Sequence, residues 1–340
     1  MKTGIAGFAW VTPLGADLES VWREIERGTI PEPHLLTNPE TGRVHRYLPV
    51  PPALVADLAR QPRLRRSSPI SYFAVAAALG ALADAGLVLT PELAARTAIV
   101  LAVSDGGVVY TRRFYEQIVK QGANAASPML FPETVYNAPA SHLAAQLGLD
   151  GACYTLVGDS SVGLTAMKFA EQLLALGDVD RCVVVACEEI DWILCEAYQD
   201  WRLAATPLAE GAAALVLTRD AQLRVRTHEG VPFCRQREAG GALDRVFAEL
   251  AAGGAADLVV SCANGTFVDG VEAAALTRIG APDCVISPRC TLGESPGASA
   301  LLQVVAAAHA VRTGRHRRAL VPVVGFNQQA SGAVIENVAA

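Results

Sequence analysis

The chain has 340 residues, 51% of them hydrophobic and 18% charged, and carries a formal net charge of −6. This length suits either two domains or one large layered domain with an extensive buried core. The negative charge argues against a dedicated nucleic-acid binder, which needs a positive face to neutralise phosphates.

No run reaches the roughly 18 consecutive apolar residues that a membrane span requires. The first five residues lack the charged head and apolar stretch of a secretory signal. We therefore expect a cytoplasmic protein without membrane association. The eight cysteines show no CxxC pair and no cluster with histidine at metal-ligand spacing, so we expect no metal site, disulfide framework or cofactor.

Along the chain, apolar runs typical of buried strands alternate with alanine-rich segments of helical length. The clearest predicted strands are 99–103, 182–186, 213–217, 258–260 and 320–324. The clearest predicted helices are 70–85, 161–176, 243–252 and 298–312. Alternation of this kind predicts an α/β fold whose strands are buried on both faces.

Residues 31–67 interrupt this alternation with a Pro- and Arg-rich stretch, which indicates a surface insertion. Elsewhere the sequence contains a weak internal repeat. A helix, a glycine and a strand over 161–187 match 298–324, and a strand with its polar-Gly turn over 97–106 matches 256–265. The period is far too long for a solenoid, so we predict two similar α/β halves packed face to face.

Six strings are spread over nearly the whole chain, from Gly7-Phe8-Ala9 to Gly325-Phe326. They cover residues 7–15, 157–167, 210–217, 264–276, 287–298 and 325–330. In this order they resemble the motifs of the β-ketoacyl synthase family. The resemblance implies a thiolase fold, in which two duplicated α/β halves form a five-layer αβαβα architecture. We assign the halves to residues 1–218 and 219–340, with the insertion at 31–67 in the first.

The resemblance also implies where an active site lies. Ser160 stands at the position of the family's cysteine nucleophile, Asn264 at the first catalytic histidine, Arg289 at the lysine and Glu294 at the second histidine. Decarboxylative condensation needs a thiolate to hold the acyl chain and imidazole donors to stabilise the enolate. With both donors replaced, we predict that condensing activity is lost.

The first functional interpretation is a partner subunit that resembles a chain length factor and acts in carrier-protein-dependent fatty acid, polyketide or aryl-polyene synthesis. It would form a homodimer, or a heterodimer with an active ketosynthase, through the apolar strand at 153–157. An acyl carrier protein is a possible further partner. On the same resemblance, Asp159, Arg289 and Phe326 lie where substrate would be contacted. In a partner subunit, Ser160 would only cap the helix that follows it.

Two alternatives stay open. In the first, Ser160 is an acyl-accepting nucleophile of an acyltransferase or thioesterase, with Glu294 or Asp159 as base and Asn264 as oxyanion donor. In the second, the chain is a non-catalytic scaffold in which Arg289 and Glu294 pair and fill the old cavity.

Overall fold

The computed structural model describes residues 3–251, 253–280, 282, 284–326 and 328–337. Residues 1–2 of the N-terminal segment, residue 252 of the predicted helix 243–252 and Asn327 of the 325–330 motif lie outside the described residues. The other predicted strands and helices are confirmed within a few residues. The strands are β4 (Thr97–Val103), β6 (Arg181–Glu188), β8 (Gly211–Thr218), β11 (Leu258–Val260) and β13 (Arg318–Gly325). The helices are α3 (Pro69–Asp84), α7 (Val162–Leu176), α9 (Ala239–Ala251) and α12 (Ser299–Arg312).

Further elements complete two matching wings of one large sheet. The first wing has the order β5-β4-β6-β8-β1, with β5 at Cys153–Val157 and β1 at Thr3–Val11. The second has the order β12-β11-β13-β14-β9, with β12 at Val285–Ile286, β14 at Gln329–Asn337 and β9 at Leu223–Thr227. Antiparallel pairing of β1 with β9 joins the wings, and β10 (Val231–Pro232) pairs with β14.

The pairing directions repeat between the wings. The strand β4 is parallel to β5 and β6, as β11 is parallel to β12 and β13. The next two contacts in each wing, β6–β8–β1 and β13–β14–β9, are antiparallel. This repeat confirms the duplicated thiolase fold that the sequence predicts. The strand β8 ends at Thr218 in the first wing, and β9 begins at Leu223 in the second. The boundary between the halves at 218/219 stays a proposal.

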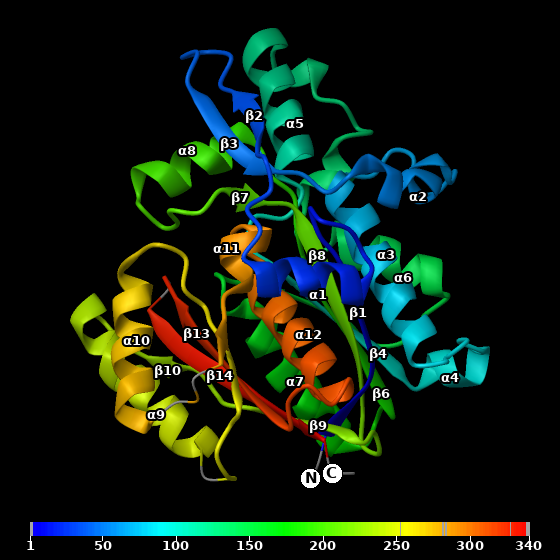
Figure 1. Ribbon diagram of the computed structural model, residues 1–340. Helices are drawn as coiled ribbons and strands as arrows, with labels where there is room; N and C mark the ends of the chain where they lie inside the picture. Colours follow the sequence, from blue (N-terminus) through cyan, green and yellow to red (C-terminus); the bar gives the residue numbers. More distant parts are fainter. Residues whose placement is uncertain (1–2, 252, 281, 283, 327, 338–340) are drawn as a thin grey trace.

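Five layers result, as Figure 1 shows. The helices α7 and α12 lie between the two wings and share their largest apolar cluster. The outer face of the first wing is covered by α3 and α6 (Ala138–Leu147), and that of the second by α9 and α10 (Phe267–Ile279). Residues 299–311 of α12 are all buried, because a sheet covers the helix on either side. Its many alanines let both sheets approach closely.

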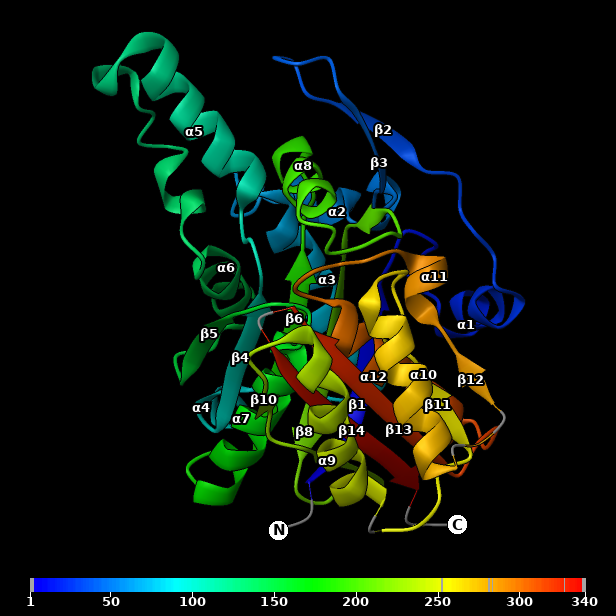
Figure 2. The same ribbon diagram turned by 90° about the vertical axis from the view of Figure 1, so that its left-hand side faces the viewer.

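Two segments project from the layered body (Figure 2). One is α5 (Val108–Gln121), which continues through two short 3₁₀ turns, Ala123–Ala125 and Phe131–Thr134. The other is a hairpin of β2 (His34–Thr37) and β3 (Val44–Leu48) within the Pro- and Arg-rich stretch, and β3 also pairs with β7 (Leu208–Ala209). The remaining helices are α1 (Leu18–Arg27), the five-residue α2 (Ala56–Arg60) and α4 (Pro91–Ala95), α8 (Trp192–Asp200) and α11 (Pro288–Leu292).

No helix in the described part of the chain combines the length and the apolar character needed to cross a bilayer.

Candidate functional site

Three of the predicted site residues, Asp159, Ser160 and Glu294, lie in turns at the N-terminal ends of the two central helices. The helices α7 and α12 touch there, since a Cβ on Gly163 would lie 3.2 Å from the backbone nitrogen of Leu301. The first turn, residues 158–161, precedes α7, and the second, residues 293–298, precedes α12. The contact brings segments more than 130 residues apart into one region.

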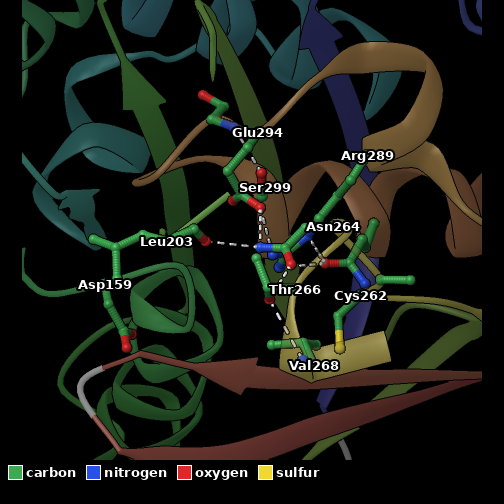
Figure 3. A network of polar contacts seen from close by, with 12 residues as sticks. Asp159, Leu203, Cys262, Asn264, Thr266, Val268, Arg289, Glu294 and Ser299 are labelled. Carbon is green, nitrogen blue, oxygen red and sulfur yellow. Dashed lines mark hydrogen bonds and ion pairs between the residues drawn. The ribbon is translucent and has the colours of Figure 1, made fainter. Parts of the chain in front are cut away.

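Three of the predicted residues form a single buried network, which Figure 3 shows. Glu294 Oε2 accepts a hydrogen bond from Arg289 Nη1 at 2.8 Å and another from Asn264 Nδ2 at 3.2 Å. The Arg289 and Glu294 side chains are 2% and 0% exposed. The predicted pairing of Arg289 with Glu294 is therefore present.

Gln303 on α12 extends this network, and its role was missed in the sequence. Its Oε1 accepts hydrogen bonds from Nε and Nη2 of Arg289, at 3.3 and 3.0 Å. Its Nε2 donates to the carbonyl oxygens of Val260 and Ser261, at 3.0 and 2.9 Å. The guanidinium thus lies between a carboxylate and an amide that is fixed to the end of β11. No motif singles out a glutamine within an alanine-rich helix.

Burial opposes the charge on Arg289, but the neighbouring Glu294, together with Cys262 and Glu272, outweighs this effect and raises the pKa of the guanidinium. The arginine is therefore a permanent cation balanced by one buried carboxylate. The other oxygen of that carboxylate, Glu294 Oε1, is buried without a hydrogen-bond partner among the described residues. A fully buried charge pair of this kind is strongly destabilised by loss of one member.

Asn264 connects the network to the loop before β7. The Asn264 side chain also donates to the carbonyl oxygen of Leu203 at 3.2 Å. The backbone carbonyl oxygen of Asn264 accepts a hydrogen bond from the backbone N–H of Ala205 at 3.0 Å. Thr266 Oγ1 donates to Asn264 Oδ1 at 2.6 Å. Every polar group of the Asn264 side chain is therefore in use, so its amide is held in one orientation.

The turn before α7 has a separate set of bonds. Asp159 Oδ1 accepts from the backbone N–H of Ser161 at 2.9 Å and from its hydroxyl at 2.6 Å. Gln329 Nε2 donates to Ser161 Oγ. Asp159, a predicted base for Ser160, is thus bonded to the following serine instead. In Figure 3, Asp159 lies apart from the network around Glu294.

Ser160 itself is buried, at 1% exposure. Among the described residues, no hydrogen bond joins it to Asn264, Arg289 or Glu294. The predicted capping role of Ser160 is wrong, because α7 begins at Val162 and its N-cap is Ser161. The turn is one residue longer than predicted, since the Asp159 side chain satisfies the backbone N–H ahead of the helix.

Phe326 lies at the end of β13, against α8. Its ring packs edge-on against Tyr198, with centroids 5.5 Å apart. Both rings line a cavity of about 250 Å³, together with Asp105, Leu203 and the largely exposed Trp201. A small apolar space therefore remains beside the predicted substrate position. Neither Ser160 nor Glu294 lines it.

A second group of buried acids lies at the end of β6, where no sequence motif indicates a site. Glu188 Oε2 accepts from the backbone N–H groups of Ser104 and Gly297, at 2.9 and 3.0 Å. Burial, reinforced by the charge of Asp105, raises the pKa of Glu188 well above its usual range. Burial also raises the pKa of Asp105. Through these hydrogen bonds Glu188 links Ser104 in the first half to Gly297 in the second.

The six histidines lie outside the network, and five of them lie within 4.0 Å of a carboxylate oxygen. The pairs are His45 with Glu196, His142 with Glu133, His228 with Glu249, His309 with Glu19, and His316 with Asp257. Neither imidazole donors nor a thiol are among the side chains that bond Glu294 or Asn264 in the described residues. The described residues also contain no group of three or more metal-ligating side chains.

Comparison with known proteins agrees with this architecture. The model of the family described as "Beta-ketoacyl synthase, N-terminal domain" matches residues 3–222. A 3-oxoacyl-[acyl-carrier-protein] synthase 2 of Vibrio harveyi is 25% identical over 190 residues, which are 54% of this chain and 45% of that protein. A putative polyketide beta-ketoacyl synthase 2 of Streptomyces cyaneus is 26% identical over 198 residues, 55% of this chain and 45% of its own. The chain thus matches less than half the length of these relatives.

Solved structures match over the whole chain. The ishigamide ketosynthase/chain length factor has a TM-score of 0.82 at 21% identity and covers 99% of this chain and 100% of its own. A ketosynthase (ApeO) in complex with its chain length factor (ApeC) from Xenorhabdus doucetiae has a TM-score of 0.79 at 14% identity, covering 99% and 98%. At these identities the likeness establishes the fold.

Proposed function

This chain belongs to the β-ketoacyl synthase family, and we propose that it is a non-condensing subunit that partners an active ketosynthase in carrier-protein-dependent acyl chain synthesis. The observation that carries the proposal is the buried network of Asn264, Arg289 and Glu294. A carboxylate held by a guanidinium and an amide through one oxygen cannot stabilise a developing enolate, whose charge it repels. Ser160 supplies a hydroxyl where condensation needs a thiolate.

The free edge of the first wing supports a protein partner. The strand β5 pairs only with β4 among the described strands, and its Tyr154 and Val157 are exposed. Exposed, unpaired edge strands need to be covered. Beside it, Figure 2 shows the arm that begins with α5, where Val119 and Phe131 are also exposed. Similar structures in which a ketosynthase and a chain length factor occur together favour a second chain of this fold as the occupant.

We propose an acyl carrier protein as a further partner. The cytoplasmic location stays a prediction. One similar structure, with a TM-score of 0.82, is that of an acyl-carrier protein in complex with its ketosynthase. Electrostatic complementarity accelerates encounters with acidic proteins. Arg65 and Arg66, both exposed, would serve such an encounter on this chain.

The first test is chemical. The purified chain is incubated with malonyl- and acyl-carrier protein, and the products are followed by intact mass spectrometry. We expect no elongation and no acyl adduct, with Ser160→Ala indistinguishable from the parent. Elongation by the chain alone would refute the proposal. An adduct that Ser160→Ala abolishes would instead establish the serine-dependent acyltransferase or thioesterase.

The second test is association. The chain is co-expressed with tagged ketosynthases of the same organism, and co-purification is measured with Val157→Arg and with Leu176→Arg as a matched control. Leu176 is 72% exposed and is the last residue of α7. We expect Val157→Arg alone to abolish co-purification. If no co-expressed ketosynthase co-purifies with the parent chain and the chain elutes as a monomer, the scaffold interpretation replaces the partner interpretation.

A further inference from the structure

The cavity of about 250 Å³ beside Phe326 lies between α8 and the segment that leads from β4 into α5. Figure 2 shows α8 and α5 next to each other above the sheet layers. Most of the side chains that line the cavity are apolar, among them Val108, Ile193 and Leu203. One acid, Asp105, lines it as well, and no Lys, Arg or His is among the described lining residues. The cavity is therefore an apolar space with one acidic group.

The carboxyl group of Asp105 is not satisfied within the described part of the chain. Its Oδ2 is buried there without a hydrogen-bond partner. The adjacent helix α5 carries Arg112, but this guanidinium is bonded to Asp191 and Glu116. Burial raises the pKa of Asp105, because the ionised form lacks both water and a counterion. A bound cation would supply the missing charge and stabilise the carboxylate.

The acids near the cavity add to its preference for a cation. Burial raises the pKa of the Tyr198 hydroxyl, and the charges of Asp105, Glu294 and Glu188 raise it further. Glu294 is balanced by the guanidinium of Arg289. Glu188 instead accepts from backbone N–H groups, including that of Asp105 at 3.3 Å. An anion would therefore be repelled at this position, whereas a cation would be attracted.

Three aromatic residues, Tyr198, Trp201 and Phe326, line the same cavity. The rings of Tyr198 and Phe326 meet edge to face, with an interplanar angle of 87°. In such a pair, the ring that contributes its edge keeps both faces free of its partner. Trp201 is 71% exposed, so most of its surface is free to contact a ligand. Aromatic faces attract cations, and tryptophan does so most strongly.

We propose that this cavity binds a small organic cation with a methylated ammonium head group. Asp105 supplies the opposite charge, and the three aromatic residues contact the methylated nitrogen. A primary ammonium has three N–H donors to satisfy, whereas methyl groups suit the apolar walls of this cavity. The volume lies below that of pockets for drug-sized molecules, so the ligand is small. The proposal holds whether or not the chain partners a ketosynthase.

Choline and its neutral carbon isostere, 3,3-dimethyl-1-butanol, serve as probes in calorimetric titrations of the full chain. The two molecules have the same shape and differ in charge. We expect choline to bind at least about 10-fold more tightly than the alcohol, since only the cation gains from the carboxylate and the rings. Equal affinity for the two probes would mean an ordinary apolar space and would overturn the proposal. So would the absence of choline binding to the folded parent chain.

Variants locate the binding site. Asp105→Asn keeps the shape of the side chain and removes its charge, and Trp201→Leu removes a ring that is mostly exposed. Each should weaken choline binding about 10-fold and leave the binding of the alcohol nearly unchanged. The matched control is Asp57→Asn, at a side chain that is 96% exposed and outside the cavity. Equal weakening by Asp57→Asn would mean a general effect of charge and would contradict the site.

The pH dependence of the affinity gives a second measurement. A cation binds the ionised form of Asp105, whose pKa is raised, so the affinity for choline should increase as pH rises through that pKa. Glu188, at the end of β6, also has a raised pKa and accounts for any slope that remains in Asp105→Asn. Thermal unfolding checks that each variant folds. If Asp105→Asn does not fold, Trp201→Leu and the neutral isostere still decide the proposal.

Discussion

The turns that lead into α7 and α12 occupy matching places in the two halves, yet they hold their polar groups in different ways. In the first, Asp159 bonds Ser161 two residues later, and Gln329 donates to the same serine from the other half of the chain. In the second, Glu294 forms a buried charge pair with Arg289, five residues away, and also accepts from Asn264, thirty residues away. Duplicated backbone geometry therefore does not fix how a turn is stabilised. We expect the second turn to be the more sensitive to substitution.

Breaking the charge pair of the second turn should destabilise the protein most. Arg289→Met leaves Glu294 buried and unpaired, which should lower the free energy of unfolding by about 3–5 kcal/mol. The double variant Arg289→Met/Glu294→Leu should recover most of this loss, because it removes both charges. Urea unfolding measures all three proteins. If the single and double variants are equally destabilised, the pair is not what holds this turn.

The central strands of the halves end differently as well, and pH tests this difference. The strand β6 is followed by an acid, Glu189, and burial raises the pKa of this acid to about 7. The strand β13 ends at Gly325 and is followed by Phe326, so no acid stands in the matching place. An acid with a raised folded-state pKa stabilises the fold fully below its unfolded pKa, and this stability is lost as pH rises through the folded pKa. For Glu189 the loss amounts to about 3 kcal/mol between roughly pH 4.5 and 7.

Unfolding free energies measured from pH 5 to 8 should therefore fall, and Glu189→Gln should flatten the slope. The matched control, Glu32→Gln at an exposed position, should leave it unchanged. Burial also raises the pKa of Glu210 to about 7, so some slope remains in the Glu189 variant. An identical slope in all three proteins would show that Glu189 is ionised in the folded state.

Substitution of one glycine in each turn compares how much added volume the two turns tolerate. A Cβ on Gly297, in the second turn, would lie 2.8 Å from the carbonyl oxygen of Cys187 and 2.8 Å from the backbone nitrogen of Ser104. A Cβ on Gly158, in the first, would meet only the Val162 side chain, at 3.1 Å. We expect Gly297→Ala to destabilise by about 1–3 kcal/mol and Gly158→Ala by less, in thermal or urea unfolding. The reverse order would contradict the expected greater sensitivity of the second turn to substitution.

The weakest effect concerns the two neighbouring serines. Ser161→Ala removes the hydroxyl that bonds Asp159 and Gln329, and should destabilise by about 1 kcal/mol. Ser160→Ala should change the stability less, because no such bond is made by Ser160 among the described residues. Denaturant midpoints of the two variants, measured side by side, test this ranking. A larger loss for Ser160→Ala would restore a structural role to its hydroxyl.

Much of the fold could be predicted from the sequence because its strands are buried on both faces. Runs such as 99–103 and 182–186 are continuous and apolar, and buried strands of α/β folds show this pattern. The arm that begins with α5 carries no such signal, since none of the helix residues is fully buried. An element without an apolar face toward the core leaves no periodic trace in the sequence.

At the site, the family resemblance grouped Asn264, Arg289 and Glu294, because each lies in a motif string that matches the family. The motifs could not identify Gln303 or Glu188, which complete the polar contacts from within regular elements. The role of Glu188 depends on backbone groups from both halves, and that of Gln303 depends on carbonyl oxygens of neighbouring strands in its own half. The partners of Ser161 were missed for the same reason, since Gln329 is 168 residues away.

The charge pair of the second turn also restricts how this sequence can diverge. A change at Arg289 alone, or at Glu294 alone, passes through a protein with an uncompensated buried charge. Drift at either position is therefore blocked unless the other follows at nearly the same time. In an alignment of this chain's own descendants and sister lineages, we expect the two columns to covary, with intact arginine–glutamate pairs or jointly neutral residues and few mixed states.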